Sequence, residues 1–182
     1  MANVNNPFGL RPVMRTLGGG DPNVFGYTKA AAYSHAIYKW DPVTQLAGVL
    51  NGPASGMTAG TTRPIGVALA YSLASLLATL LVMDDPGAIF CVQGDGSGSG
   101  ANIIDPTTVG YNANLNYTGT AGGGVTRDNS GVQLTESTIA TTSTLDVRIL
   151  RLHNDPTNAY GVYGIVEVVF NKHLNNKEVT TT

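Results

Sequence analysis

The most apolar part of the chain is a stretch that a single turn signal divides in two. Residues 77–83 and 88–93 are rich in Leu, Val, Ile and Phe, and the tetrapeptide Asp-Asp-Pro-Gly lies between them at 84–87. Its proline fixes φ near the value that the second position of a type I turn needs, and an aspartate suits the first position. The pattern predicts two buried strands that fold back on each other as a hairpin. A helix over residues 72–83 is the alternative, because leucines then fall at helical spacing: Leu73, Leu76, Leu77, Leu80 and Leu81.

The last third of the chain alternates between apolar and polar positions. In residues 138–151, Leu145, Val147 and Ile149 share one face, with Asp146 and Arg148 opposite. In residues 160–170, the apolar face is made by Val166, Val168 and Phe170, with Glu167 and Val169 on the other face. A turn over residues 153–158 separates the two runs, so we expect an antiparallel hairpin.

Weaker strand patterns cover residues 36–40, 44–50, 65–71 and 109–115. The connections between them are rich in glycine, above all the loops at 94–100 and 119–131. Aspartate precedes five of the nine prolines, at 22, 42, 86, 106 and 156, and Asp-Pro favours turns over helix. The sequence therefore predicts an all-β fold, an antiparallel β-sandwich or barrel with long Gly-rich loops.

Residues 1–24 lack hydrophobic periodicity and are broken by Pro and Gly, yet they carry apolar side chains such as Phe8, Leu10 and Val13. They are expected to form an extended arm that covers the core of its own domain or binds another subunit. A β-rich domain over 25–171 follows, and then a polar tail over 172–182.

Charged residues make up only 12% of the chain, about half the usual share, and apolar residues 42%. This balance argues against disorder and for a neutral surface of the kind that an assembly buries. The net charge is −2 and no basic stripe is visible, so direct nucleic-acid binding is not expected. The apolar run is too short to span a bilayer, and the N-terminus lacks the pattern of a signal peptide.

Candidate chemistry is sparse. His35, His153 and His173 have no metal-ligand spacing and are expected in surface or turn positions, and the single cysteine, Cys91, is expected to pack as a small buried hydrophobe. Residues 96–101 match a loose dinucleotide fingerprint, but no helix can follow them to hold a pyrophosphate. The paired aspartates at 84–85 are interpreted as turn formers. We expect no catalytic residue, no cofactor and no metal, and hence not an enzyme.

Taken in order, these segments resemble the capsid decoration (cement) proteins of tailed bacteriophages. The similar pieces are Asn-x-Pro-Phe-Gly-Leu-Arg-Pro-Val at 5–13, Val-Met-Asp-Asp-Pro at 82–86 with Phe90 and Val92-Gln93 after it, residues 109–115, and residues 130–134 leading to Thr141-Thr142 and the last hairpin. Residues 73–79 are richer in leucine than is typical of that family.

The resemblance implies a non-enzymatic virion protein, made in the bacterial cytoplasm, that sits on the capsid exterior and bridges capsomers. Its partner would be the major capsid protein of an HK97-like shell, and homo-oligomers are expected on the capsid. The candidate contacts to the shell or a sister subunit lie in the arm: Phe8, Leu10, Arg11, Pro12 and Val13. The alternatives are another phage structural part, such as a tail or head-completion protein, and a carbohydrate-binding module.

Overall fold

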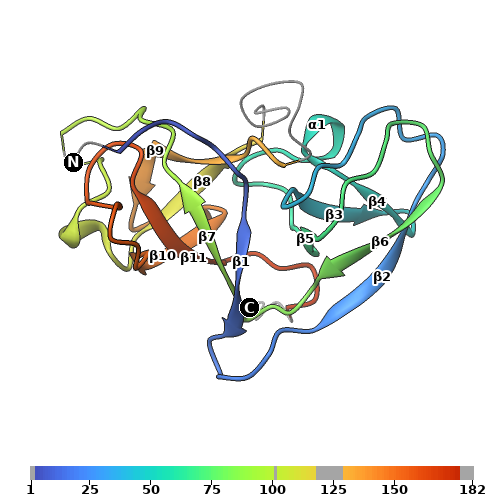
Figure 1. Cartoon of the computed structure of the whole chain (residues 1–182), viewed down its shortest axis with the longest axis horizontal. Coiled ribbons are helices and arrows are strands. Elements are labelled where there is room, and N and C mark those ends of the chain that lie inside the picture. The colour runs from blue at the N-terminus through green and yellow to red at the C-terminus, as the bar shows by residue number, and fades with distance from the viewer. Residues whose placement is uncertain (1–2, 101, 118–128, 177–182) are drawn as a thin grey trace, which may run out of the picture.

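A computed structural model of the chain describes residues 3–100, 102–117 and 129–176 (Figure 1). Over these residues the fold is all-β, with a single α-helical turn, α1 (Pro53–Gly56), and a 3-10 turn at Pro106–Thr108. The strands are β1 (Arg11–Thr16), β2 (Val24–Lys29), β3 (Pro42–Leu46), β4 (Val49–Asn51), β5 (Gly66–Ala68), β6 (Ala78–Met83), β7 (Ala88–Gln93), β8 (Asn112–Asn116), β9 (Gln133–Ala140), β10 (Val147–Leu152) and β11 (Ile165–Phe170). They form two sheets, one of them a closed barrel, which confirms the predicted fold class.

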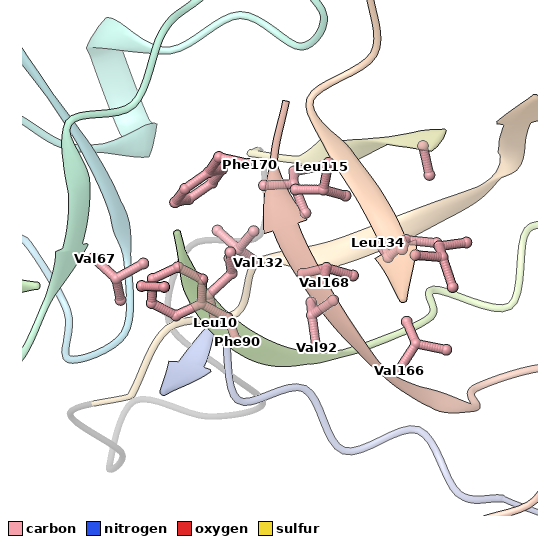
Figure 2. Packing of buried hydrophobic residues seen from close by; sticks show 14 of the residues in the cluster. Leu10, Val67, Phe90, Val92, Leu115, Val132, Leu134, Val166, Val168 and Phe170 are labelled. Atoms are coloured by element: carbon pink, nitrogen blue, oxygen red, sulfur yellow. The ribbon is translucent and has the colours of Figure 1, made fainter. Parts of the chain in front are cut away.

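The first sheet has six strands in the order β1-β7-β11-β10-β8-β9 and occupies the left and centre of Figure 1. It curls until β9 approaches the end of β7, where the Asp95 N–H donates to the Leu134 carbonyl at 2.9 Å. The inward side chains form one apolar core (Figure 2), in which the Phe90 and Phe170 ring centroids lie 5.4 Å apart. β1 lies outside the curled part, as an edge strand beside β7.

The second sheet closes into a five-stranded barrel in the order β2-β4-β3-β5-β6. Its interior is a separate apolar cluster that includes Ile37, Leu50 and Val82, all fully buried. β3 and β4 are joined by Ala47 and Gly48, which both have positive φ (49° and 83°), as a tight two-residue hairpin needs.

Two strand predictions in this region are wrong. The single strand expected over 44–50 is the β3–β4 hairpin, and residues 36–40 form only isolated bridges at Ile37 and Lys39. The strand begins instead at Pro42, a residue that can open a strand although it cannot donate within a ladder.

The central apolar stretch forms two strands, as predicted, but they do not pair with each other. β6 pairs with β2 and β5 in the barrel, whereas β7 pairs with β1 and β11 in the first sheet. The turn at 84–87 is present, with the Gly87 N–H donating to Asp85 Oδ1 at 2.7 Å, and it carries the chain from one sheet to the other. The predicted hairpin and the alternative helix are therefore both wrong. Turn chemistry is local, whereas the choice of strand partner depends on distant parts of the chain.

The positions of β6 and β7 explain why the stretch is so apolar. In β6, Leu80 and Val82 face the barrel interior and Met83 belongs to the core of the first sheet, whereas Thr79 and Leu81 remain exposed. β7 is buried at all six positions, and a strand buried on both faces loses the alternation of a half-exposed strand. The two cores consequently meet through β5 and β6, each of which contributes residues to both clusters.

The C-terminal hairpin is confirmed. β10 and β11 pair antiparallel, and Val147, Ile149, Val166 and Val168 are buried on the inner face with Phe170. A register shift between Ile149 and Arg151 marks a β-bulge, so Arg148 and Arg151 both lie on the outer face.

Candidate functional site

The outer face of the first sheet carries a row of side chains that crosses four strands. Arg11 on β1 pairs with Cys91 on β7, Cys91 with Glu167 on β11, and Glu167 with Arg151 on β10. Paired residues of antiparallel strands project to the same face, so the order across the row is Arg, Cys, Glu, Arg. The Arg11 Nε–H donates to Cys91 Sγ at 3.3 Å.

Glu167 is the hub of this row. Its Oε2 accepts from Arg15 at 2.6 Å and from Arg151 at 2.7 Å, and its Oε1 lies 3.2 Å from Nδ1 of His153. The Glu167 side chain is only 5% exposed, whereas the Arg15 and Arg151 side chains are 44% and 51% exposed. The carboxylate therefore lies beneath the arginines and holds two guanidinium groups at the surface in fixed positions.

The register adds a fourth arginine, because Arg148 pairs with Val169 and is exposed. We call Arg11, Arg15, Arg148 and Arg151, with Glu167 at their centre, the arginine face. The apolar floor of this face is made by three buried side chains, Ile89, Cys91 and Val169.

A groove of about 650 Å³ adjoins the arginine face. Its floor includes Gln93 and Ile165, and its walls are the N-terminal segment 3–8 and the loop at 155–163. Gln93 links the two walls, because its Nε2 donates to the carbonyl of Val4 at 2.9 Å and to that of Tyr163 at 3.2 Å.

Side-chain amides also fix the N-terminal segment to the body. The Asn3 amide bonds both backbone groups of Ala159, Gln93 accepts from the Asn6 N–H at 2.8 Å, and Gln133 donates to Asn5. The N-terminal segment thus lies on its own domain. Among the residues that the structure describes, the segment from Asn3 onward is part of the folded body.

The five candidate contact residues of the arm have different environments. Leu10 is fully buried in the core of the first sheet, so its side chain is not available to a partner. Phe8 lines the groove, with the Arg11 guanidinium 5.1 Å from its ring centroid. Pro12 pairs with Phe90, and Pro12 and Val13 are half-buried on the edge strand. Four of the five are therefore partly exposed, but Pro12 shares the face of its partner Phe90, opposite to the face of Arg11 and Cys91.

The Gly-rich loop at 94–100 surrounds a carboxylate of the protein itself. Glu136 of β9 is fully buried, and its Oε1 accepts from the backbone N–H groups of Tyr163 at 3.0 Å and Gly96 at 3.4 Å. A Cβ at Gly94 or Gly98 would overlap the Glu136 carboxylate. Burial raises the pKa of Glu136. The loop is therefore a cradle for an internal carboxyl group, which accounts for the partial dinucleotide fingerprint. The second loop, at 119–131, lies mostly outside the described residues.

The other candidate residues have structural partners. Cys91 is a free cysteine whose side chain is buried, as expected. Asp84 accepts from the Tyr27 hydroxyl at 2.6 Å. His35 is exposed, but His173 has a buried side chain and burial lowers its pKa. Asp41 is buried as well, and desolvation raises its pKa to about 7.

Within the described ranges, no group of three or more His, Cys, Asp or Glu side chains is placed to hold a metal ion. No helix found there is long and apolar enough to cross a bilayer. Comparisons with protein-family models, with curated proteins and with solved structures find no match.

Sequence reasoning missed most of the arginine face. It singled out Arg11 as a contact residue but not Arg15, Arg148 or Arg151, because these come together only through the β1-β7-β11-β10 strand order. One signal in the sequence could have indicated the site. Glu167 is the only charged residue of β11 and lies between valines, so its carboxylate needs partners from neighbouring strands.

Proposed function

We propose that this chain is a non-enzymatic virion structural protein that binds the outer face of a phage capsid and bridges capsomers. The observation that supports it most is the state of residues 5–13, the segment that resembles decoration proteins. These residues are fixed by side-chain amides and by pairing with β7, and they hold Phe8, Arg11, Pro12 and Val13, all partly exposed, in a preformed arrangement. A preformed surface loses little conformational entropy when it binds.

The proposed mechanism is multivalent clamping of the shell formed by the major capsid protein. Burying a side chain such as Phe8 contributes roughly 1.5–3 kcal/mol, which is too little to hold a protein on a shell by itself. Contacts made together by the groove edge, by the edge strand and by neighbouring copies raise the effective concentration of each, so weak contacts add up.

Self-association is part of the proposal, and the leucine loop at 73–77 supports it. Leu73, Leu76 and Leu77 are 58%, 48% and 66% exposed. The loop is held in place by the Ser75 N–H, which donates to the Tyr33 carbonyl at 2.8 Å, and Ser75 has a φ of 53°. No charged residue occurs between Arg63 and Asp84 in the sequence, so the loop itself brings no charge into a contact between two copies.

The test uses the whole chain and purified expanded heads that lack it. Occupancy is measured by co-sedimentation and the position by cryo-EM of the decorated heads. We expect saturable binding on the capsid exterior across capsomer boundaries. Binding to tails or to the portal vertex would support the alternative of a tail or head-completion protein, and binding only to a glycan array would support a carbohydrate-binding module.

The matched variants are Phe8→Ser, in the proposed contact surface, and Leu76→Ser with Leu77→Ser, in the leucine loop. Phe8→Ser is expected to reduce head occupancy while sedimentation of the free protein is unchanged. The double leucine variant is expected to abolish self-association in solution and to weaken occupancy indirectly. Head occupancy that is unchanged in both variants would contradict the proposed contacts.

A further inference from the structure

We infer that the arginine face is a docking surface for an acidic protein surface. The inference rests on the proposed function for its location, since the acidic surface would then be the exterior of the shell. Its evidence is separate, because it comes from the charge, burial and register of residues on β1, β7, β10 and β11.

Positive charge is concentrated on the arginine face. The chain has a net charge of −2, yet four of its six arginines lie on this one face. The carboxylates near them are Glu167, which lies beneath the arginines, and Asp155, which lines the adjoining groove. The face thus has a positive balance on a chain that is acidic as a whole, and such a local field favours a partner with carboxylates.

Arg15 and Arg151 have N–H donors that Glu167 does not use. A guanidinium has five N–H donors, and Arg15 and Arg151 each direct theirs to the single Oε2 of Glu167 while about half of each side chain stays exposed. The remaining N–H groups are oriented by Glu167, so a partner carboxylate meets donors that are already ordered. Ordered arginines over an apolar floor are typical of the residues that dominate protein interfaces.

The charge and size of the arginine face favour a compact acidic protein surface over a second copy or a nucleic acid. A second copy of the same face would bring arginines against arginines, so this face is not suited to a symmetric self-contact. A long duplex would extend past the four strands, about 15 Å at the usual strand spacing, onto the rest of an acidic chain. A compact acidic patch on a protein avoids both problems.

The experiment compares three variants at about 50 mM and about 300 mM salt, a range over which surface charge pairs become screened. Arg148→Glu reverses an exposed charge that does not touch Glu167. The triple variant Arg15→Gln, Arg151→Gln, Glu167→Gln neutralises the network without leaving a buried unpaired charge. Lys39→Glu, which lies against the Trp40 ring outside the arginine face, is the control with the same change in net charge as Arg148→Glu. Urea unfolding of each variant confirms that it is folded.

Two probes separate this inference from the proposed function: expanded heads and fluorescently labelled poly-L-glutamate. We expect Arg148→Glu and the triple variant to weaken binding to both probes at least about fivefold at low salt. Lys39→Glu should bind nearly as the wild type does, and high salt should reduce the differences.

The outcomes are distinct. If the wild type binds heads and the arginine-face variants bind equally well, the inference is overturned and the proposed function stands. If the wild type binds poly-L-glutamate through these arginines but does not bind heads, the inference stands and the proposed function fails. Binding to neither probe, or a preference of the same arginines for duplex DNA over poly-L-glutamate, overturns the inference.

Discussion

Replacing Asp41 by Asn is expected to remove a large part of the pH dependence of stability. The Asp41 residue is 3% exposed, and its Oδ2 accepts from the Tyr38 N–H at 2.8 Å. The Ser130 hydroxyl also donates to this carboxylate, but desolvation outweighs both hydrogen bonds and raises the pKa from 3.8 to about 7. An amide oxygen can accept from Tyr38 and carries no charge to bury, so Asn is a close substitute.

The direction and the size of this pH dependence follow from the linkage between proton binding and folding. Because the folded-state pKa of Asp41 lies above its unfolded value, the folded state holds a proton that the unfolded state has released. The contribution to stability is therefore full below about pH 4 and is lost as the pH rises to about 7. At ~1.4 kcal/mol per pKa unit, the loss between about pH 5 and about pH 8 is roughly 2–3 kcal/mol.

The assay is urea unfolding at several pH values, followed by the fluorescence of Trp40, the only tryptophan and the neighbour of Asp41. Between about pH 5 and about pH 8, the unfolding free energy of the wild type should fall by roughly 2–3 kcal/mol relative to that of the Asp41→Asn variant. The control is Asp105→Asn, an exposed carboxylate whose pKa is lowered by hydrogen bonds from Thr107, so its difference should be flat over this range. An Asp41→Asn difference that is also flat would refute the reasoning.

Two further predictions concern the first sheet. Gly98→Ala is expected to lower the unfolding free energy by roughly 1–3 kcal/mol, because the added Cβ would overlap the Asn102 carbonyl oxygen. Gly18→Ala has nothing within 4 Å of the added Cβ and should leave the urea midpoint unchanged; equal midpoints for both variants would contradict the cradle. Cys91 is 1% exposed and burial raises the pKa of its thiol, so a thiol reagent at about pH 8 should label it only as fast as the chain unfolds. Rapid labelling of the native protein would show that the outer face of β7 is open to solvent.

The sequence revealed most of the strands because burial leaves a local pattern. The alternation in β10 and β11 is readable, since one face of each strand carries a regular apolar row: Val147, Ile149, Val166, Val168 and Phe170. The turn at 84–87 is readable because proline and aspartate act within four residues. The partners of β6 and β7 could not be predicted, because no local sequence pattern indicates that consecutive strands pair in different sheets.

The candidate site was readable only in part, for the same physical reason. Arg11 stood out within a motif, but its companions on the arginine face come from β10 and β11, near the other end of the chain. The cradle around Glu136 left one unused signal, the glycines at every second position from 94 to 100. The Cβ positions of Gly94 and Gly98 point at the buried Glu136 carboxyl group and that of Gly96 at the Tyr163 ring, and Gly96 and Gly100 also have positive φ (71° and 61°).

The fixed N-terminal segment has a consequence for the order in which the chain matures. Residues near the start of this sequence need partners more than 150 positions further along: Asn3 bonds Ala159, and Arg15 pairs with Glu167. Until β11 has been synthesised and has paired with β7, Arg15 and Arg151 have no common carboxylate to assemble around. The arginine face therefore exists only on chains that have been synthesised through β11 and have folded. A partner that recognises this face would select finished subunits over nascent or misfolded ones, with no separate proofreading step.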